Sequence, residues 1–172
     1  AKKGVLNESI VSTELGLKGI PNISESINMY RDIEILRYSG GKIHIPYVTT
    51  SKGVDLIREA KKNNLDITAS VSLAHITFSE KDIPEFDTNY KLIPPLRSES
   101  DLNSLKEGLV DGTLDYLTSM HEPFDIDNKK IVFDNASSGS IGLESMFGLM
   151  SNQFTLEKTI DILTRKKTIF EV

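Results

Sequence analysis

The residues that could do chemistry in this chain gather where a short apolar run ends. The run Leu114 to Met120 is bounded by a glycine and a proline, which is typical of a buried strand of a parallel sheet. Enzymes built on parallel strands carry catalytic groups at the carboxyl ends of those strands. Here that end reads Ser-Met-His-Glu-Pro-Phe over residues 119–124. His121 and Met120 therefore fall in a candidate site, although the thioether of Met120 can neither neutralise a cation nor act as a base.

Three histidines are the other candidate metal ligands or bases, namely His44, His75 and His121. A zinc site needs three or four ligands within about 2 Å of one ion, and the spacing of these histidines matches no local metal motif. We interpret them as structural, with a new zinc site as the alternative. Asp125 and Asp127 lack the glycine and distal glutamate of a calcium loop, so we expect them in a solvated loop.

Composition favours one domain and disfavours several partners. The chain has 172 residues, 38% of them hydrophobic, and a net charge of -5 with scattered basic residues apart from a cluster at 165–167. We therefore expect no nucleic-acid partner. The absence of cysteine excludes disulfides and thiolate metal sites. Without a long apolar run or a signal peptide, we expect a cytoplasmic protein with no membrane partner.

Apolar spacing predicts alternating strands and helices. A helix is expected to begin at Asn22, with Glu25 completing a capping box and one face formed by Ile23, Ile27, Tyr30 and Ile33. In chain order we then expect strand 42–48, helix 51–63 with Val54, Ile57 and Ala60 inward, strand 66–72, a helical turn at 79–82, a brief strand 90–93, helix 98–109 with Leu102, Leu105 and Leu109 inward, strand 114–120, and helices 142–150 and 155–164.

This alternation predicts an α/β fold with a parallel sheet, amounting to about half of a (β/α)8 TIM-type barrel. We expect residues 1–172 to form a single partial barrel domain, with a lead-in at 1–21, βα units at 22–120, a loop at 121–140 and closing helices at 141–172. Pro46 would remove a hydrogen-bond donor from a central strand. Because the chain begins at Ala1 and stops after an apolar pattern, we expect both ends to be cut.

Several blocks of the sequence resemble dihydroorotases, the cyclic amidohydrolases of pyrimidine synthesis. Residues 119–124 resemble their Thr-Asp-His-Ala-Pro-His signature, and residues 89–97 resemble their Pro-Pro-Leu-Arg stretch. Residues 14–21, 133–134 and 139–144 add to the resemblance, which runs from about Val5 to Phe170 and corresponds to less than half of a full-length member. It implies the second half of a metal-dependent amidohydrolase barrel, with zinc as the family's cofactor.

The resemblance also implies two metal positions, and both are changed here. Tyr47 replaces a histidine ligand, and Met120 replaces an aspartate that binds metal and moves a proton. A phenol with a pKa near 10 is a poor ligand, and a thioether can neither neutralise a cation nor act as a base. We therefore expect no intact metal site, no cofactor and no catalytic residue in this chain.

The substrate positions implied by the resemblance are changed as well, with one exception. Ile93 replaces an asparagine, Phe124 a histidine and Ser138 a phenylalanine, and Gly139 alone is kept.

Three functions remain open from the sequence. The first is a dihydroorotase-like protein without catalysis that acts as a structural or regulatory partner, as degenerate relatives that scaffold aspartate transcarbamoylase do. The second is part of a working zinc-dependent dihydroorotase whose other half carries further metal ligands. The third is a small-molecule binding module that uses an apolar pocket lined by Ile93, Met120 and Phe124. An open half barrel has two unpaired sheet edges, so we expect either a missing barrel half, a second copy or a transcarbamoylase-like partner to cover them.

Overall fold

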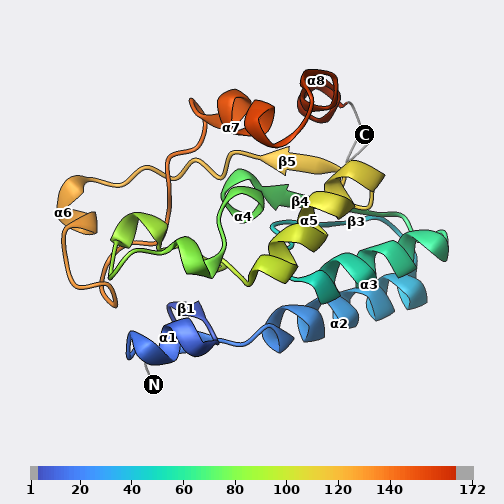
Figure 1. Ribbon diagram of the computed structural model, residues 1–172. Coiled ribbons are helices and arrows are strands. Elements are labelled where there is room, and N and C mark those ends of the chain that lie inside the picture. The colour runs from blue at the N-terminus through green and yellow to red at the C-terminus, as the bar shows by residue number, and fades with distance from the viewer. Residues whose placement is uncertain (1–3, 166–172) are drawn as a thin grey trace.

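The computed structural model describes residues 4–165 as an α/β arrangement of parallel strands and helices (Figure 1). In chain order the elements are β1 (Leu6–Asn7), α1 (Ile10–Glu14), β2 (Gly19–Ile20), α2 (Ile23–Ser39), β3 (Ile43–Ile45), α3 (Ser51–Lys62), β4 (Ile67–Ser72), α4 (Leu73–Thr77), the 3-10 turns η1 (Glu80–Asp82) and η2 (Thr88–Tyr90), α5 (Glu99–Asp111), β5 (Tyr116–Thr118), α6 (Ile126–Lys129), α7 (Met146–Gln153) and α8 (Leu156–Thr164). Lys166, Lys167 and Phe170 lie outside the described residues.

The central feature is a three-stranded parallel sheet in the order β3, β4, β5. Ile43 of β3 pairs with Ile67 of β4, and Ser70 of β4 pairs with Tyr116 of β5. The predicted parallel alternation is therefore confirmed, and in the described part of the chain β3 is an edge strand. Pro46 follows β3 and lies outside it. The prediction that Pro46 interrupts a central strand was wrong, because the strand ends one residue earlier and loses no hydrogen bond to it.

Two helices contribute the buried faces that the sequence predicted for them. Val54, Ile57 and Ala60 of α3 are buried in the main core. Leu105 and Leu109 of α5 enter the same core, and α5 packs against α3 and α4. Figure 1 shows α2 and α3 side by side on one side of the sheet, with α7 and α8 beside β5 on the other. None of the helices within residues 4–165 combines the length and hydropathy needed to span a bilayer.

The predicted face of α2 was wrong at three of its four residues, and only Ile33 is buried as predicted. Ile23, Ile27 and Tyr30 are exposed, each by more than half of its surface. The buried side of the helix is formed instead by Met29, Ile33 and Leu36, which pack into the main core. Apolar residues surround this helix on nearly all sides, so their spacing alone did not select the face that packs.

Two other segments differ from the prediction. Residues 90–93 form no strand, because η2 ends at Tyr90 and irregular chain follows. The lead-in, for which the sequence predicted no elements, contains β1, α1 and β2, and β1 and β2 pair in parallel. Val5 and Leu6 then form a small second cluster with Phe133 from the loop after β5. The amino-terminal segment and that loop therefore stabilise each other.

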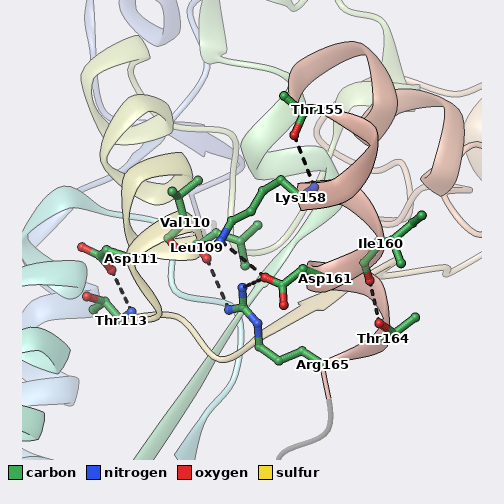
Figure 2. Close-up of polar contacts among 10 residues, drawn as sticks. All are labelled: Leu109, Val110, Asp111, Thr113, Thr155, Lys158, Ile160, Asp161, Thr164 and Arg165. Atoms are coloured by element: carbon green, nitrogen blue, oxygen red, sulfur yellow. Dashed lines mark hydrogen bonds and ion pairs between the residues drawn. The ribbon is translucent and has the colours of Figure 1, made fainter.

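The side chains of Lys158 and Arg165 link α8 to the end of α5 through hydrogen bonds (Figure 2). Lys158 Nζ donates to the Val110 carbonyl at 3.1 Å, and Arg165 Nη1 donates to the Leu109 carbonyl at 3.4 Å. Carbonyls in the last turn of a helix have no partner within it, and positive charge is favourable there. Asp161 accepts from both cations, and the hydrogen bond from Arg165 lowers the pKa of its carboxyl group.

Candidate functional site

The candidate site lies where β3, β4 and β5 end, because parallel strands present their carboxyl ends at one edge of a sheet. Tyr47 follows β3, His75 lies in α4 directly after β4, and Met120 follows β5. Tyr47 is partly exposed, whereas Met120 is buried with 4% of its surface accessible.

Tyr47 and Met120 share an unusual backbone conformation. Their φ angles are 53° and 48°, in the left-handed region that disfavours residues with a Cβ atom. Strained backbone of this kind costs about 1 to 3 kcal/mol and gathers at functional sites. The two positions that the resemblance implies as metal ligands therefore have a constrained backbone, and each carries a side chain that fits zinc poorly.

His75 is buried, and both of its ring nitrogens have hydrogen-bond partners. Its Nε2 lies 3.0 Å from the Pro94 carbonyl, which can only accept, so the proton is on Nε2. Nδ1 then accepts from the Ser72 hydroxyl at 2.6 Å. Burial, and to a smaller extent the positive charge of Arg97, lower the pKa of His75 to about 4, although hydrogen bonds to the carbonyls of Pro94 and Pro95 act in the opposite direction. Ser72 is also fully buried, so the side chains of this pair lie in the packed interior of the protein.

The other two histidines have separate partners. His44 Nδ1 lies 2.8 Å from the Thr68 hydroxyl, and burial lowers the pKa of His44. His121 Nδ1 lies 3.4 Å from the Gly142 amide, which donates to it. No group of three or more histidine, aspartate or glutamate side chains within residues 4–165 is placed to hold a metal. The three histidines therefore do not form the alternative zinc site, and the described residues at the strand ends do not fit zinc.

Asp125 and Asp127 lie at the start of α6, and both are exposed. This exposure agrees with the predicted solvated position, but the prediction of a loop was wrong for Asp127, which lies in the short helix α6. Figure 1 shows α6 within the long connection between β5 and α7.

A buried polar network beneath the strand ends was missed by sequence reasoning. Arg97 Nη1 donates to Asn7 Oδ1 at 2.8 Å and to the Ile20 carbonyl at 2.7 Å, and its Nε donates to the Thr49 hydroxyl at 3.2 Å. Burial lowers the pKa of Arg97, against the nearby charges of Glu25, Asp101 and Glu80. The sequence feature that could have indicated this network is the Pro-Pro-Leu-Arg stretch, because its arginine links the β1 and β2 segment to Thr49, which precedes α3.

Glu25 belongs to the same network, and its predicted role in a capping box was wrong. Its carboxylate accepts from the amides of Thr49 and Thr50 at 3.1 and 3.0 Å and from both threonine hydroxyls. Asn22 has no capping hydrogen bond and donates instead to Asp101 at 3.2 Å. These tertiary contacts replace the local ones because they satisfy buried donors at the start of α3.

Two lysines hold the segment after β5, which the sequence predicted to be a loop at 121–140 and which contains the short helix α6. Lys91 Nζ donates to the carbonyls of Phe133, Asp134 and Ala136 at 2.7, 3.0 and 2.7 Å, and burial lowers its pKa. Lys129 has a similar set of partners.

Lys129 Nζ donates to the carbonyls of Thr88, Ser137 and Gly139 at 3.0, 3.0 and 2.6 Å. Burial lowers the pKa of Lys129, and the charge of Lys91 lowers it further, against the charge of Asp87. The two ammonium groups therefore determine the path of the loop between His121 and Ser140.

Two cavities flank the strand ends, and they separate the substrate positions implied by the resemblance. A cavity of about 500 Å³ is lined by Phe124 and Gly139. A second of about 350 Å³ is lined by Tyr47 and Ile93. Met120 lines neither, and Ser138 is partly exposed outside both. The expected single pocket lined by Ile93, Met120 and Phe124 is therefore not formed within the described residues.

Similarity to known proteins covers most of the chain. It is 38% identical over 169 residues to the dihydroorotase of Listeria innocua, across 95% of this chain and 40% of that protein. It is 41% identical over 158 residues to the dihydroorotase of Caldanaerobacter subterraneus, across 92% of this chain and 36% of that protein. The chain thus spans well under half the length of the curated relatives it matches. No family model matches it.

Solved structures show the same fold. A D-hydantoinase superposes with a TM-score of 0.72 at 20% identity, covering 81% of this chain and 33% of that structure. A dihydroorotase from Saccharomyces cerevisiae, in complex with 5-fluoroorotic acid, superposes with a TM-score of 0.66 at 15% identity, covering 79% of this chain and 40% of that structure. The predicted fold class, an α/β fold that corresponds to part of a (β/α)8 barrel, is confirmed.

Proposed function

We propose that this chain, a homologue of dihydroorotases over most of its length, is a dihydroorotase-like protein of pyrimidine biosynthesis that acts without catalysis as a structural or regulatory partner. The observation that carries the proposal is Met120, which is buried at the carboxyl end of β5 with 4% of its surface exposed. Its thioether can neither accept a proton from an attacking water nor neutralise a divalent cation.

Loss of the general base at position 120 should lower the rate of hydrolysis enough for an assay to distinguish a non-catalytic protein from a working dihydroorotase. A positioned general base contributes typically about 10²- to 10⁴-fold to rate. Tyr47 adds the loss of a metal ligand, and the described residues hold no alternative cluster that would supply one. These changes remove different requirements of hydrolysis, so a compensating change at one position would not restore the others.

Two surfaces support a role in association. In the described part of the chain β3 and β5 have unpaired edges, and such edges favour pairing with further strands. The outer side of α2 also exposes Ile23, Ile27 and Tyr30. The covering element would be a missing barrel half, a second copy of the chain or an aspartate transcarbamoylase-like partner.

The decisive measurement is hydrolysis of dihydroorotate together with metal content, on the chain alone and on the chain assembled with the other half of the barrel, with the Listeria innocua dihydroorotase as positive control. We expect no turnover above background and no stoichiometric zinc. Turnover within about a hundredfold of the control would overturn the proposal and favour the alternative, a working zinc-dependent dihydroorotase. Tightly bound zinc that is lost in a Met120→Ala variant would do the same.

Association is tested separately by size-exclusion chromatography with light scattering, on the protein alone and mixed with aspartate transcarbamoylase. We expect either a self-associated species or a complex. A compact monomer that unfolds cooperatively and binds no transcarbamoylase would contradict the partner role and leave the question of catalysis untouched.

A further inference from the structure

The larger cavity has the size and walls of a small-molecule site. It measures about 500 Å³ and lies between α4, residues 89–96, the loop after β5 and the start of α7. Ligand pockets commonly span about 300 to 1,000 Å³ with mostly apolar walls and a few polar groups. Leu73, Leu92, Leu96 and Leu149 line this one.

Two departures from the signature of the relatives converge on this cavity. Residues 119–124 resemble Thr-Asp-His-Ala-Pro-His, so Glu122 stands where that signature has alanine and Phe124 where it has histidine. Both residues line the cavity, together with Phe78 and Tyr90. The rings of Phe78 and Tyr90 meet edge to face, with 5.5 Å between their centroids. The cavity therefore combines a new carboxylate with three aromatic rings.

The charges around the cavity favour a cation over an anion. Its charged lining residues are Glu122 and Lys129. An ammonium has three N–H donors, and Lys129 uses three on the carbonyls of Thr88, Ser137 and Gly139. It has no donor left for an anionic ligand. Within the described residues, the Glu122 carboxylate has no hydrogen bond or ion pair, so it is available to a ligand.

We propose that this cavity binds an organic cation, namely an ammonium group carried on a flat apolar body. The ammonium pairs with Glu122, and the ring system lies against Phe124, Phe78 and Tyr90. Aromatic faces attract cations and pack flat apolar groups, so both parts of the ligand are recognised by the same walls. The proposal does not depend on whether the protein hydrolyses dihydroorotate.

A matched series of naphthalene probes tests the charge preference. The probes are 2-naphthylmethylamine, the neutral 2-naphthylmethanol and the anionic 2-naphthoate. The chain contains no tryptophan, so the polarisation of naphthalene fluorescence reports binding directly. We expect the amine to bind about fivefold more tightly than the alcohol, which is the upper range for an exposed ion pair, and the naphthoate to bind most weakly. Equal or tighter binding of the naphthoate, or no binding of the amine, would overturn the proposal.

Three variants locate the site. Glu122→Gln keeps the shape of the side chain and should remove the preference for the amine over the alcohol. Phe124→Leu should weaken the amine about two- to fivefold by removing one aromatic face. Glu144→Gln removes an exposed carboxylate outside the cavity and should change neither affinity. Unchanged preference in Glu122→Gln, or an equal loss in Glu144→Gln, would show that the probe binds elsewhere and refute the assignment.

Discussion

Mild acid should destabilise the protein through His75. Burial holds the pKa of His75 at about 4 in the folded protein, against 6.5 for an ordinary histidine. Above about pH 6.5 the imidazole is neutral in both the folded and the unfolded state. Between about pH 6.5 and pH 4 the unfolded chain binds a proton that the folded protein excludes, so unfolding becomes more favourable as the pH falls. This contribution to stability is therefore fully present at neutral pH and is lost in acid.

The size of the effect follows from the difference between the two pKa values. Each unit corresponds to about 1.36 kcal/mol, so lowering the pH from about 7 to about 5 should remove about 2 kcal/mol from the free energy of unfolding. Solvent does not weaken this contribution to stability, because the imidazole ring is buried between Ser72 and Pro94. A loss of that size is a large share of the stability of an ordinary domain.

Urea denaturation followed by far-ultraviolet circular dichroism measures this loss at several pH values. Other groups also titrate, so the informative quantity is the difference in unfolding free energy between the wild type and a His75→Gln variant. That difference should shrink by about 2 kcal/mol between about pH 7 and pH 5. A His44→Gln variant should show a smaller change, because His44 is only partly buried. A difference for His75→Gln that is constant across this range would refute the reasoning.

Three substitutions test other features of the structure. Lys91→Met should destabilise the protein by about 3 kcal/mol, because three carbonyls lose their donor, and should speed hydrogen exchange in residues 121–140. The control Lys130→Met changes an exposed side chain and should have neither effect. Gly139→Ala should abolish amine binding in the larger cavity, because the added Cβ would lie 2.7 Å from the Glu122 carbonyl oxygen and 2.7 Å from the Phe124 ring. The control Gly148→Ala adds a Cβ in open space and should leave binding intact. Arg97→Met should cost about 3 kcal/mol in urea titrations and loosen the β1 and β2 segment, and unchanged stability would show that the network is dispensable.

Much of the fold could be predicted from the sequence where apolar periodicity was unambiguous. The helix with Val54, Ile57 and Ala60 has one apolar side and one charged side, so its packing face followed directly. For α2 the same method chose the wrong face, because Ile23 and Ile27 compete with Met29 and Leu36 around the helix. Which face packs there is decided by the surface of α3 and the sheet, and no local pattern contains that information.

The candidate site was predictable in its location but not in its contacts. The strand end at Met120 could be identified from the run of apolar residues before it. The partners of Glu25 and Arg97 could not, because Glu25 meets Thr49 and Arg97 meets Asn7 only after distant segments pack together. The same holds for Lys91, whose three carbonyl partners lie more than forty residues further along the chain.

The strand order also bears on how the chain acquires its structure during synthesis. β3, β4 and β5 lie in the sheet in the same order as in the sequence, so each strand can join a neighbour that has already left the ribosome. Contacts between successive segments cost less loop-closure entropy than contacts between distant ones, which favours rapid folding. Contacts of the amino-terminal segment are exceptions, because the hydrogen bond between Asn7 and Arg97 forms only after α2, α3 and β4 have been made, and the packing of Val5 and Leu6 on Phe133 forms later still. We therefore expect the sheet to form first and the amino-terminal segment to dock last, long after it was made.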